Sequence, residues 1–458
     1  MGWLFGTDGV RGVANDGLTP ELAFRLGRCA AAVLAGESVG PEGGRPGIVG
    51  RDTRRSGDLL EAALAAGVAS AGLDVLRVGV VPTPGVAYLT RTQGAAFGVM
   101  ISASHNPAED NGIKFFSADG YKLPDALEAR IEALVGPGPD RVNFSPADGL
   151  PRPVAAGVGR ILSGEDRAEA YSHFLAETAG VSLDGLRVVV DCAHGAAYRL
   201  APAVLRRLGA EVITLCDAPD GMNINVGCGS TSPEQMQAAV RRHGADAGIA
   251  YDGDGDRVIM ADERGGLVDG DAILAICGRH LAAQGRLRNR AVAATVYSNL
   301  GLKRALQAAG VEVVETPPGD RCVLEAMLER DLVLGGEQSG HVIFLEYNTT
   351  GDGLLTALQV LRIMRETGQS LGQLAGQMSR VPQILIKVAV RDKRAFHHNV
   401  RVQEVIREVQ EELGADGRLL VRPSGTEPVI RIMGEGMDNA RIQAAVDRIA
   451  AVVAAELG

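Results

Sequence analysis

The sequence predicts an α/β protein in which three α/β repeat domains, each a mixed sheet with helices, surround a cleft and are followed by a C-terminal α+β domain. Three observations predict this class. Short apolar runs alternate with amphipathic segments in a βαβαβ order that occurs three times. The third run of each copy ends in a polar loop. The last part of the chain has a different order, in which a strand and a helix precede a hairpin and a final helix.

The first copy is expected to contain strands at residues 47–50, 72–78 and 96–101 and helices that begin at Ser56 and Pro82. Serine is a residue type that caps helix N-termini, so Ser56 is expected to cap the first helix. One apolar face of that helix is expected to point inward, and it consists of Leu59, Leu60, Ala63, Leu64 and Val68. The last strand is a continuous apolar run, which is typical of a buried strand.

The second and third copies repeat this order. The second copy is expected to contain strands at 186–191, 209–214 and 246–251 and helices at 200–208 and from Pro233. The third copy is expected to contain strands at 291–296, 310–314 and 332–335 and helices at 300–309 and 320–330. The middle strand of every copy begins with glycine, then a residue of any type, an acid and valine, which indicates that the copies share one structure.

The C-terminal part differs from the repeats. Its expected elements are strands at 384–390, 417–422 and 428–433 and helices at 401–413 and about 438–456. Proline and glycine are dense at 137–160, and further boundaries are expected near 258 and at 370–380. The expected domains are residues 1–150, 151–258, 259–372 and 373–458.

Composition excludes several classes of protein. A formal net charge of −10 argues against general affinity for nucleic acids or anionic membranes. No apolar stretch is long enough to span a bilayer, and the first residues lack the basic and apolar regions of a signal peptide. The six cysteines lack CxxC spacing, which argues against a disulfide framework and against a zinc site. A cytoplasmic protein without a nucleic-acid or membrane partner is expected.

Each third strand of a repeat is followed by a loop that carries chemically useful side chains. These loops are residues 104–106, 252–256 and 336–340. Ligands of open α/β sheets bind beyond the carboxyl ends of strands, so three such loops can converge on one cleft. The alternative is that they are three unrelated surface turns.

The first loop contains Ser104, which follows the apolar run 97–101 and precedes His105 and the turn signal Asn106-Pro107. A hydroxyl at a strand end is held by a rigid sheet and can be directed at a ligand. A serine in this position is otherwise a turn cap. The other motifs of the chain favour a serine that carries phosphate, because they include a carboxylate triplet and an Arg-Pro-Ser-Gly-Thr loop.

The second loop alternates Asp252, Asp254 and Asp256 with glycine, which allows the backbone to bring three carboxylates around one centre. Three oxygen ligands with open positions suit Mg²⁺. A helix-loop-helix calcium site is excluded, because the strand-forming run 258–261 follows at once and leaves no room for the loop to coil. A solvated acidic turn is the remaining alternative.

Two further loops offer groups that bind phosphate and sugar. The C-terminal hairpin carries guanidinium, hydroxyl and glycine N–H groups that suit phosphate, namely Arg422, Ser424, Gly425, Thr426 and Arg431. Glu337 and Ser339 can bind sugar hydroxyls, and the adjacent His341 can exchange protons. Arg11, in a glycine-rich N-terminal loop, can bind phosphate or pair with an acid. The alternatives are a plain hairpin turn and structural side chains.

In their order along the chain, these motifs resemble the α-D-phosphohexomutase family over almost the whole sequence. The blocks that carry the resemblance are residues 6–12, 102–107, 252–257, 336–341 and 422–428. The glutamine of the sugar loop and the runs at 111–116 and 348–353 favour the branch of the family that acts on glucosamine phosphates. The resemblance implies four domains around a central cleft and an isomerase that interconverts glucosamine 6-phosphate and glucosamine 1-phosphate, on the route to UDP-N-acetylglucosamine and peptidoglycan.

The resemblance also implies a role for each site residue. Ser104, rather than Ser102, is the expected phosphoserine, and Asp252, Asp254 and Asp256 are expected to hold Mg²⁺ with an oxygen of that phosphate. The expected intermediate is glucosamine 1,6-bisphosphate, with glucose 1,6-bisphosphate as an alternative activator. The other expected catalytic residues are His105, Lys114, Arg11, Arg257 and His341. The domains are accordingly expected to carry phosphoserine, metal, sugar and phosphate in that order, and the last is expected to open and close.

Three alternatives remain open at this stage. A mannose or glucose phosphate mutase of the same family has the same chemistry, a phosphatase arises where water intercepts the phosphoserine, and a sugar-phosphate sensor keeps the fold without turnover. A phosphorylated hexosamine is the expected ligand. The sequence leaves open whether the protein forms a homodimer.

Overall fold

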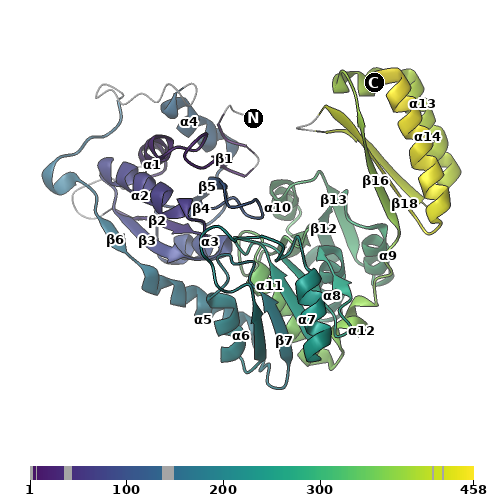
Figure 1. Cartoon of the computed structure of the whole chain (residues 1–458), viewed down its shortest axis with the longest axis horizontal. Coiled ribbons are helices and arrows are strands. Elements are labelled where there is room, and N and C mark those ends of the chain that lie inside the picture. The colour runs from purple at the N-terminus through teal and green to yellow at the C-terminus, as the bar shows by residue number, and fades with distance from the viewer. Residues whose placement is uncertain (1–3, 7, 36–43, 137–148, 415–416, 425–427) are drawn as a thin grey trace.

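A βαβαβ unit recurs three times in the computed structural model, and a smaller antiparallel sheet follows (Figure 1). The structure describes residues 4–6, 8–35, 44–136, 149–414, 417–424 and 428–458. From the N-terminus to the C-terminus, the sheets have six, five, four and three strands. The expected α/β class with a C-terminal α+β unit is therefore confirmed.

The first sheet has the strand order β1-β5-β4-β2-β3-β6. Its strands are β1 (Val10–Val13), β2 (Gly47–Arg51), β3 (Val75–Val80), β4 (Phe97–Ile101), β5 (Asp110–Ser117) and β6 (Ile161–Ser163). Its helices are α1 (Pro20–Leu34), α2 (Ser56–Ser70), α3 (Thr83–Thr92) and α4 (Asp125–Val135). The first sheet extends beyond the expected boundary at 150, because β6 pairs with β3 in parallel.

Two details of helix α2 differ from expectation. Arg55, not Ser56, is the N-cap residue, and the Ser56 hydroxyl instead accepts a hydrogen bond from Asn111 Nδ2 at 2.9 Å. Leu59 is 44% exposed, so the expected inward face was wrong at this position. The helix begins at Ser56 and turns Leu60, Leu64 and Val68 into the core instead.

The second sheet has the order β11-β10-β9-β7-β8. Its strands are β7 (Arg187–Asp191), β8 (Glu211–Leu215), β9 (Ala247–Tyr251), β10 (Val258–Ala261) and β11 (Leu267–Val268). Its helices are α5 (Ala168–Ala179), α6 (Leu200–Arg207) and α7 (Glu234–His243). The expected boundary at 258 falls inside this sheet, because β10 pairs with β9 and β11 pairs with β10.

The third sheet has the order β13-β12-β14-β15. Its strands are β12 (Ala291–Thr295), β13 (Glu312–Thr316), β14 (Leu334–Gly336) and β15 (Val342–Phe344). The helices of this part are α8 (Gly270–Ala283), α9 (Leu300–Ala308), α10 (Asp320–Glu329), α11 (Gly353–Thr367) and α12 (Leu371–Ala375). One apolar core continues from the second sheet into the third and includes buried residues of α5, α8 and α11.

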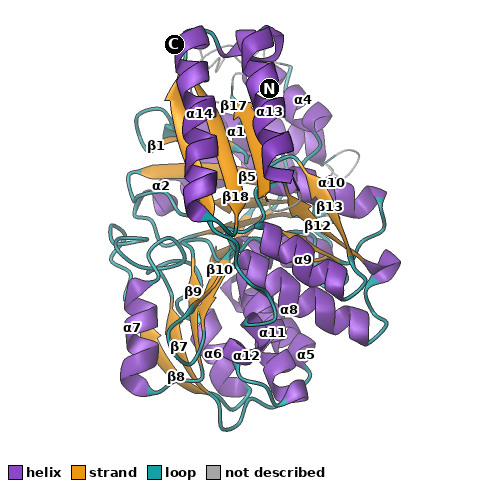
Figure 2. Ribbon diagram, turned by 90° about the vertical axis from the view of Figure 1, so that its right-hand side faces the viewer, coloured by secondary structure: helices purple, strands orange, loops and turns teal. Residues whose placement is uncertain are grey.

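The fourth sheet is antiparallel, with the order β16-β18-β17. It consists of β16 (Gln383–Ala389), β17 (Gly417–Pro423) and β18 (Val429–Gly436), and the helices α13 (Val400–Leu413) and α14 (Asn439–Leu457) lie side by side on it (Figure 2). Among the described helices, none combines the length and the hydropathy that crossing a bilayer requires.

The three repeats share one arrangement that decides where the site forms. In each, a buried strand is joined by a polar loop to an antiparallel partner, in the pairs β4–β5, β9–β10 and β14–β15. The loops are those that carry Ser104, the aspartate triplet and Glu337. The expected equivalence of the three loops is thereby confirmed.

Candidate active site

Ser104 lies just after β4, and its hydroxyl points at the loop of the second sheet. Its Oγ donates a hydrogen bond to Asp252 Oδ2 at 2.6 Å. Ser104 has a φ of 53°, in the left-handed region that few non-glycine residues adopt. Such backbone strain persists only where surrounding contacts maintain it, and it is concentrated at functional sites.

A buried network behind Ser104 holds this conformation. Ser102 Oγ donates to Asp52 Oδ2 at 2.6 Å and accepts the backbone N–H of Ser104 at 2.9 Å. Arg54 pairs with Asp52 at 2.9 Å and also donates to the carbonyl oxygens of Ser104 at 2.9 Å and Asn106 at 2.8 Å. Ser102 is therefore engaged in support of the loop, whereas the Ser104 hydroxyl points at the triplet.

Sequence reasoning missed Asp52 and Arg54. They follow β2, which lies next to β4 in the sheet, so their position at the carboxyl end of a neighbouring parallel strand was the available signal. Asn225 of the second unit was also missed. Its Nδ2 donates to the carbonyl oxygens of Ser104 at 2.9 Å and Asn106 at 3.1 Å.

The carboxylates of Asp252, Asp254 and Asp256 form a buried cluster. Their exposed fractions are 1%, 0% and 4%, and one oxygen of each lies within 4.8 Å of the others. Burial and the neighbouring carboxylates of Asp256 and Asp254 raise the pKa of Asp252. Within the described part of the chain, Oδ1 of Asp254 and Oδ1 of Asp256 have no hydrogen-bond partner. Buried carboxylate oxygens without partners fit a hard divalent cation such as Mg²⁺.

Lys114 places an ammonium beside the triplet. Its Nζ lies 2.9 Å from Asp254 Oδ2 and 2.8 Å from Asp8 Oδ2. Burial disfavours the ammonium, but Asp254 and Asp8 outweigh it and raise the pKa of Lys114. Lys114 therefore remains charged, which suits charge neutralisation and not proton acceptance.

A second lysine links the first unit to the third. Lys122 Nζ donates to Asp8 Oδ1 at 2.5 Å and also pairs with Asp320 at the start of α10. Together with Lys114, these residues form a line of alternating charges. Sequence reasoning missed Asp8, Lys122 and Asp320, because their pairing depends on the packing of two units far apart in the sequence.

His105 contacts Ser104, and Arg257 contacts the aspartate triplet. His105 Nδ1 is 3.3 Å from Ser104 Oγ, and burial, aided by the Arg257 guanidinium, lowers the pKa of His105. The ring is therefore neutral near pH 7 and can accept a proton. The Arg257 backbone N–H donates to Asp252 Oδ1 at 3.2 Å, and its Nε lies 3.8 Å from Asp256 Oδ1.

His341 lies behind the triplet. Its Nε2 accepts the backbone N–H of Gly351 at 3.1 Å, and its Nδ1 lies 3.6 Å from Asp256 Oδ2. Because Nε2 is an acceptor, the proton of a neutral ring resides on Nδ1 and faces Asp256. A Cβ at position 351 would lie 2.4 Å from the ring, so glycine is required there.

All four units contribute to a cleft of about 570 Å³. Seven of the expected site residues line it: Arg11, His105, Asp256, Arg257, Glu337, Ser424 and Arg431. An adjoining cavity of about 340 Å³ shares Arg257, Glu337 and Arg431 with it and adds Ser339. Lys114 and His341 are buried behind the cleft wall, and Gly425 and Thr426 lie outside the described residues.

Arg422, an expected phosphate ligand, contacts the third unit in this structure. Its Nε donates to the hydroxyl of Tyr297 at 2.6 Å, and its guanidinium lies 4.7 Å from the centre of that ring. Tyr297 lines the cavity of about 340 Å³. Arg422 therefore joins the fourth unit to the third in this structure, and Arg431 is the arginine of the hairpin that faces the cleft.

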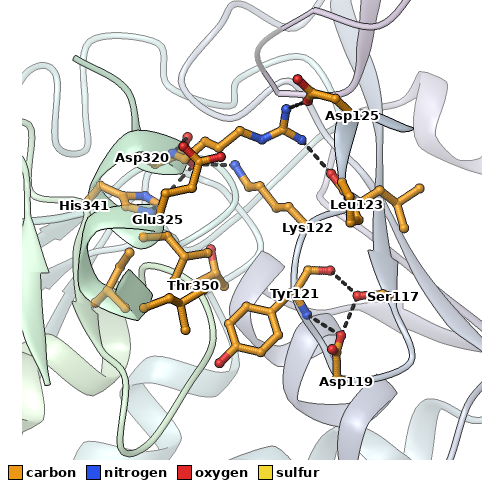
Figure 3. A pocket seen from close by; sticks show the side chains of 15 residues that line it. Ser117, Asp119, Tyr121, Lys122, Leu123, Asp125, Asp320, Glu325, His341 and Thr350 are labelled. Atoms are coloured by element: carbon orange, nitrogen blue, oxygen red, sulfur yellow. Dashed lines mark hydrogen bonds and ion pairs between the residues drawn. The ribbon is translucent and has the colours of Figure 1, made fainter. Parts of the chain in front are cut away.

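A third cavity, of about 580 Å³, lies on the other side of the Lys122–Asp320 pair (Figure 3). Its lining includes Tyr121 of the first unit and Leu324 of α10. Lys122, Asp320 and His341 form its polar wall toward the active site. No sequence motif indicated this cavity, which forms where two units meet.

A strained serine against a buried carboxylate triplet, beside a cleft that arginines from three units line, is typical of a phosphoryl-transfer site. Four domain families match the chain: phosphoglucomutase/phosphomannomutase domain I at residues 2–138, domain II at 169–266, domain III at 269–381 and the C-terminal domain at 385–452. The chain belongs to the phosphoglucomutase/phosphomannomutase family, the α-D-phosphohexomutases, as its motifs indicated.

The most similar relatives include proteins named phosphoglucosamine mutase. The protein of Desulforudis audaxviator is 56% identical over 453 residues, with 99% of this chain and 98% of the relative covered. The protein of Symbiobacterium thermophilum is 58% identical over 455 residues, with 99% of both covered.

Solved structures show the same fold. A phosphoglucomutase/phosphomannomutase family protein from Burkholderia thailandensis matches 99% of this chain and 98% of its own with a TM-score of 0.81 and 25% identity. An Aspergillus fumigatus N-acetylphosphoglucosamine mutase in complex with GlcNAc-6P and magnesium matches 99% of this chain and 96% of its own with a TM-score of 0.69. At 18% identity, this second likeness concerns the fold alone.

Proposed function

We propose that this isomerase is a phosphoglucosamine mutase, which interconverts glucosamine 6-phosphate and glucosamine 1-phosphate and so supplies the amino sugar for UDP-N-acetylglucosamine and peptidoglycan. The observation that carries the proposal is the 2.6 Å contact between Ser104 Oγ and Asp252 Oδ2. This contact places the hydroxyl that would carry the phosphate against the carboxylates that would bind the metal ion. Relatives named phosphoglucosamine mutase, 50–58% identical over nearly the whole chain, support the choice of sugar.

In the proposed reaction, Ser104 carries a phosphate. The free hydroxyl of the sugar phosphate attacks that phosphorus, the bond to Ser104 Oγ breaks, and a 1,6-bisphosphate forms. The sugar hydroxyl loses a proton and Ser104 Oγ gains one. His105 Nδ1, at 3.3 Å from Ser104 Oγ, is suited to exchange the proton of the serine oxygen. The bisphosphate then turns over in the cleft and returns its other phosphate to Ser104.

Asp252, Asp254 and Asp256 would hold Mg²⁺ together with an oxygen of the phosphate on Ser104. The bound ion would neutralise charge on the transferring group. Lys114 adds a permanent positive charge on the protein side, 2.9 Å from Asp254. Arg257, on the cleft wall, and Arg11 are proposed to hold phosphate oxygens as the group moves.

The sugar and its distal phosphate are proposed to bind on the opposite side of the cleft. Glu337 and Ser339 would hold sugar hydroxyls in either orientation, and Arg431, Ser424, Gly425 and Thr426 would hold the distal phosphate. Release of Arg422 from Tyr297 would bring a further guanidinium to that phosphate when the fourth unit closes. Glucosamine 1,6-bisphosphate or glucose 1,6-bisphosphate is the proposed activator, and the cytoplasm is the proposed location.

The test compares initial rates with the 1-phosphates of glucosamine, mannose and glucose, in the presence of Mg²⁺ and a hexose 1,6-bisphosphate. The proposal expects the highest kcat/KM for the glucosamine phosphate. Ser104→Ala should abolish turnover, whereas the exposed Ser182→Ala serves as the matched control and should retain it. Faster turnover of a neutral sugar contradicts the choice of substrate. Steady release of inorganic phosphate without isomer identifies a phosphatase instead.

A further inference from the structure

Outside the active site, three loops of the second unit bring an imidazole and two thiols together. His194 follows β7, Cys216 follows β8, and Cys228 lies ahead of α7. One potential ligand atom of each lies within 4.8 Å of the others. Cys228 is buried, and the other two are half-buried, so the cluster is within reach of solvent on one side.

The backbone holds this cluster in place. The His194 N–H donates to the Cys216 carbonyl oxygen at 2.7 Å, and the Asn225 N–H donates to the Ala193 carbonyl oxygen at 2.9 Å. His194 and Cys216 have φ values of 49° and 50°. Left-handed backbone is unfavourable for a residue with a Cβ, so neighbouring contacts must maintain these two conformations. Ligands fixed in this way need little rearrangement to receive an ion.

The side chains of the cluster are of types that bind metal ions, and the Cys216 thiol hydrogen-bonds with Cys228 and with Asp191. Both cysteines are free thiols, and within the described residues no group hydrogen-bonds the buried Nδ1 of His194. Two sulfurs and one imidazole nitrogen are the donors that suit Zn²⁺, which commonly binds tetrahedrally with thiolate and imidazole ligands. They do not suit Mg²⁺, which prefers oxygen, so the cluster and the aspartate triplet differ in the ion they select.

We propose that His194, Cys216 and Cys228 form a binding site for a thiophilic transition-metal ion, Zn²⁺ above all, with the fourth position open to water. On binding, the ion forms two bonds to sulfur and one to nitrogen, and the two thiol protons pass to solvent. The existence of this site does not depend on which sugar phosphate the enzyme converts.

Hydrogen bonds connect the loops of this cluster to the loops of the active site. The His194 carbonyl oxygen accepts the hydroxyl of Thr53 at 2.5 Å, and the Ala196 N–H donates to the carbonyl oxygen of Gly253, within the aspartate loop, at 2.8 Å. Asn225, which donates to the Ser104 carbonyl oxygen, lies between the two cysteines in sequence. An ion at the cluster would therefore stiffen the chain that supports the phosphoserine loop.

The test uses Co²⁺ as a spectroscopic substitute for Zn²⁺ on the full-length protein, kept reduced, with excess Mg²⁺ to occupy the aspartate triplet. Thiolate ligation gives sulfur-to-cobalt charge-transfer absorption that carboxylates do not produce. We expect one equivalent of Co²⁺ to produce this absorption and one equivalent of Zn²⁺ to remove it. Zn²⁺ should also raise the midpoint of thermal unfolding.

Variants assign the absorption to the cluster. Cys216→Ser should abolish it and weaken Zn²⁺ binding at least about tenfold, and so should His194→Asn, since asparagine tolerates left-handed backbone. Cys322→Ser, in α10, is the matched control and should leave both unchanged. Absence of the absorption in the wild-type protein with both thiols reduced overturns the proposal. Equal absorption in folded Cys216→Ser overturns it as well.

Discussion

Ser104 Oγ and Asp252 Oδ2 lie 2.6 Å apart although 148 positions separate the two residues in the sequence. The contact joins the polar loops of two structural repeats, each located where a buried strand meets its antiparallel partner. A hydroxyl that carries phosphate in this position would extend its oxygens toward all three carboxylates of the triplet. The relationship explains why the metal and the phosphate are proposed to act as one unit.

Removing a carboxylate of the triplet should lower the catalytic rate and leave the protein folded. Asp254→Asn is expected to lower kcat at least about a hundredfold, because charge neutralisation supplies much of the acceleration of phosphoryl transfer. The variant should remain folded, since one fewer buried carboxylate reduces the repulsion within the cluster. Steady-state rates over a range of Mg²⁺ concentrations and thermal unfolding check both points. Wild-type activity at low Mg²⁺ in Asp254→Asn contradicts the metal assignment.

Ser102 should affect catalysis by holding Ser104 in position. Ser102→Ala removes the acceptor of the Ser104 N–H and a donor to Asp52, and a lost buried hydrogen-bond partner costs about 1–3 kcal/mol. We expect kcat to fall about tenfold, KM to change little, and phosphorylation at position 104 to persist. Rate measurements with phosphosite mapping test this. A complete loss of phosphate from the protein would identify Ser102 as the acceptor instead.

Lys122 should stabilise the junction of the first and third units. Its half-buried ammonium bridges Asp8 and Asp320, so Lys122→Met removes the lysine that pairs with Asp320 and one of the cations that pair with Asp8, at a cost of about 1–3 kcal/mol. The expected result is a lower midpoint in urea unfolding. The double variant Lys122→Met with Asp320→Asn should regain part of the loss, because the side chain at position 320 is then neutral and no longer needs the lysine. If the double variant recovers no stability, the loss in Lys122→Met does not come from the Lys122–Asp320 pair.

Asp271 should make stability depend on pH. This buried residue near the start of α8 accepts the Asn299 N–H at 2.7 Å, and burial raises the pKa of Asp271 from 3.8 to about 7. Since the folded protein holds this proton more tightly than the unfolded chain, stability from this group is present below about pH 4 and is lost as pH rises toward 7.

Asp271→Asn removes that dependence. The variant should be more stable than wild type at pH 8, by up to about 4 kcal/mol at 1.36 kcal/mol for each pKa unit, and the difference should be small at pH 4.5. Thermal unfolding of both proteins at the two pH values measures it. A difference that is the same at both pH values contradicts the raised pKa.

The sequence predicted the features that depend on local pattern. Continuous apolar runs identify β4 and β9, and the loops after them follow from strand ends, so Ser104 and the aspartate triplet could be located without a structure. Leu59 was assigned to the core on local pattern, yet it is exposed in the structure.

Features that depend on distant contacts could not be predicted. Lys122 meets Asp320 across 198 positions, and nothing in either local sequence indicates the partner. Cys216 and Cys228 lack the short spacing of common zinc motifs, and their approach to His194 depends on the packing of three separate loops. The contact of Arg422 with Tyr297 could not be predicted either, since orientation within a hairpin depends on the neighbouring unit.

Phosphosite mapping of the intact protein tests the central claim most directly. The protein is incubated with glucose 1,6-bisphosphate and Mg²⁺, digested and sequenced by mass spectrometry, alongside Ser104→Ala. The account predicts a single phosphate on Ser104, lost on addition of excess glucosamine 1-phosphate at the rate of turnover, and none in the variant. Phosphate on Ser102 or on any other residue, or isomer formation by Ser104→Ala, would contradict it.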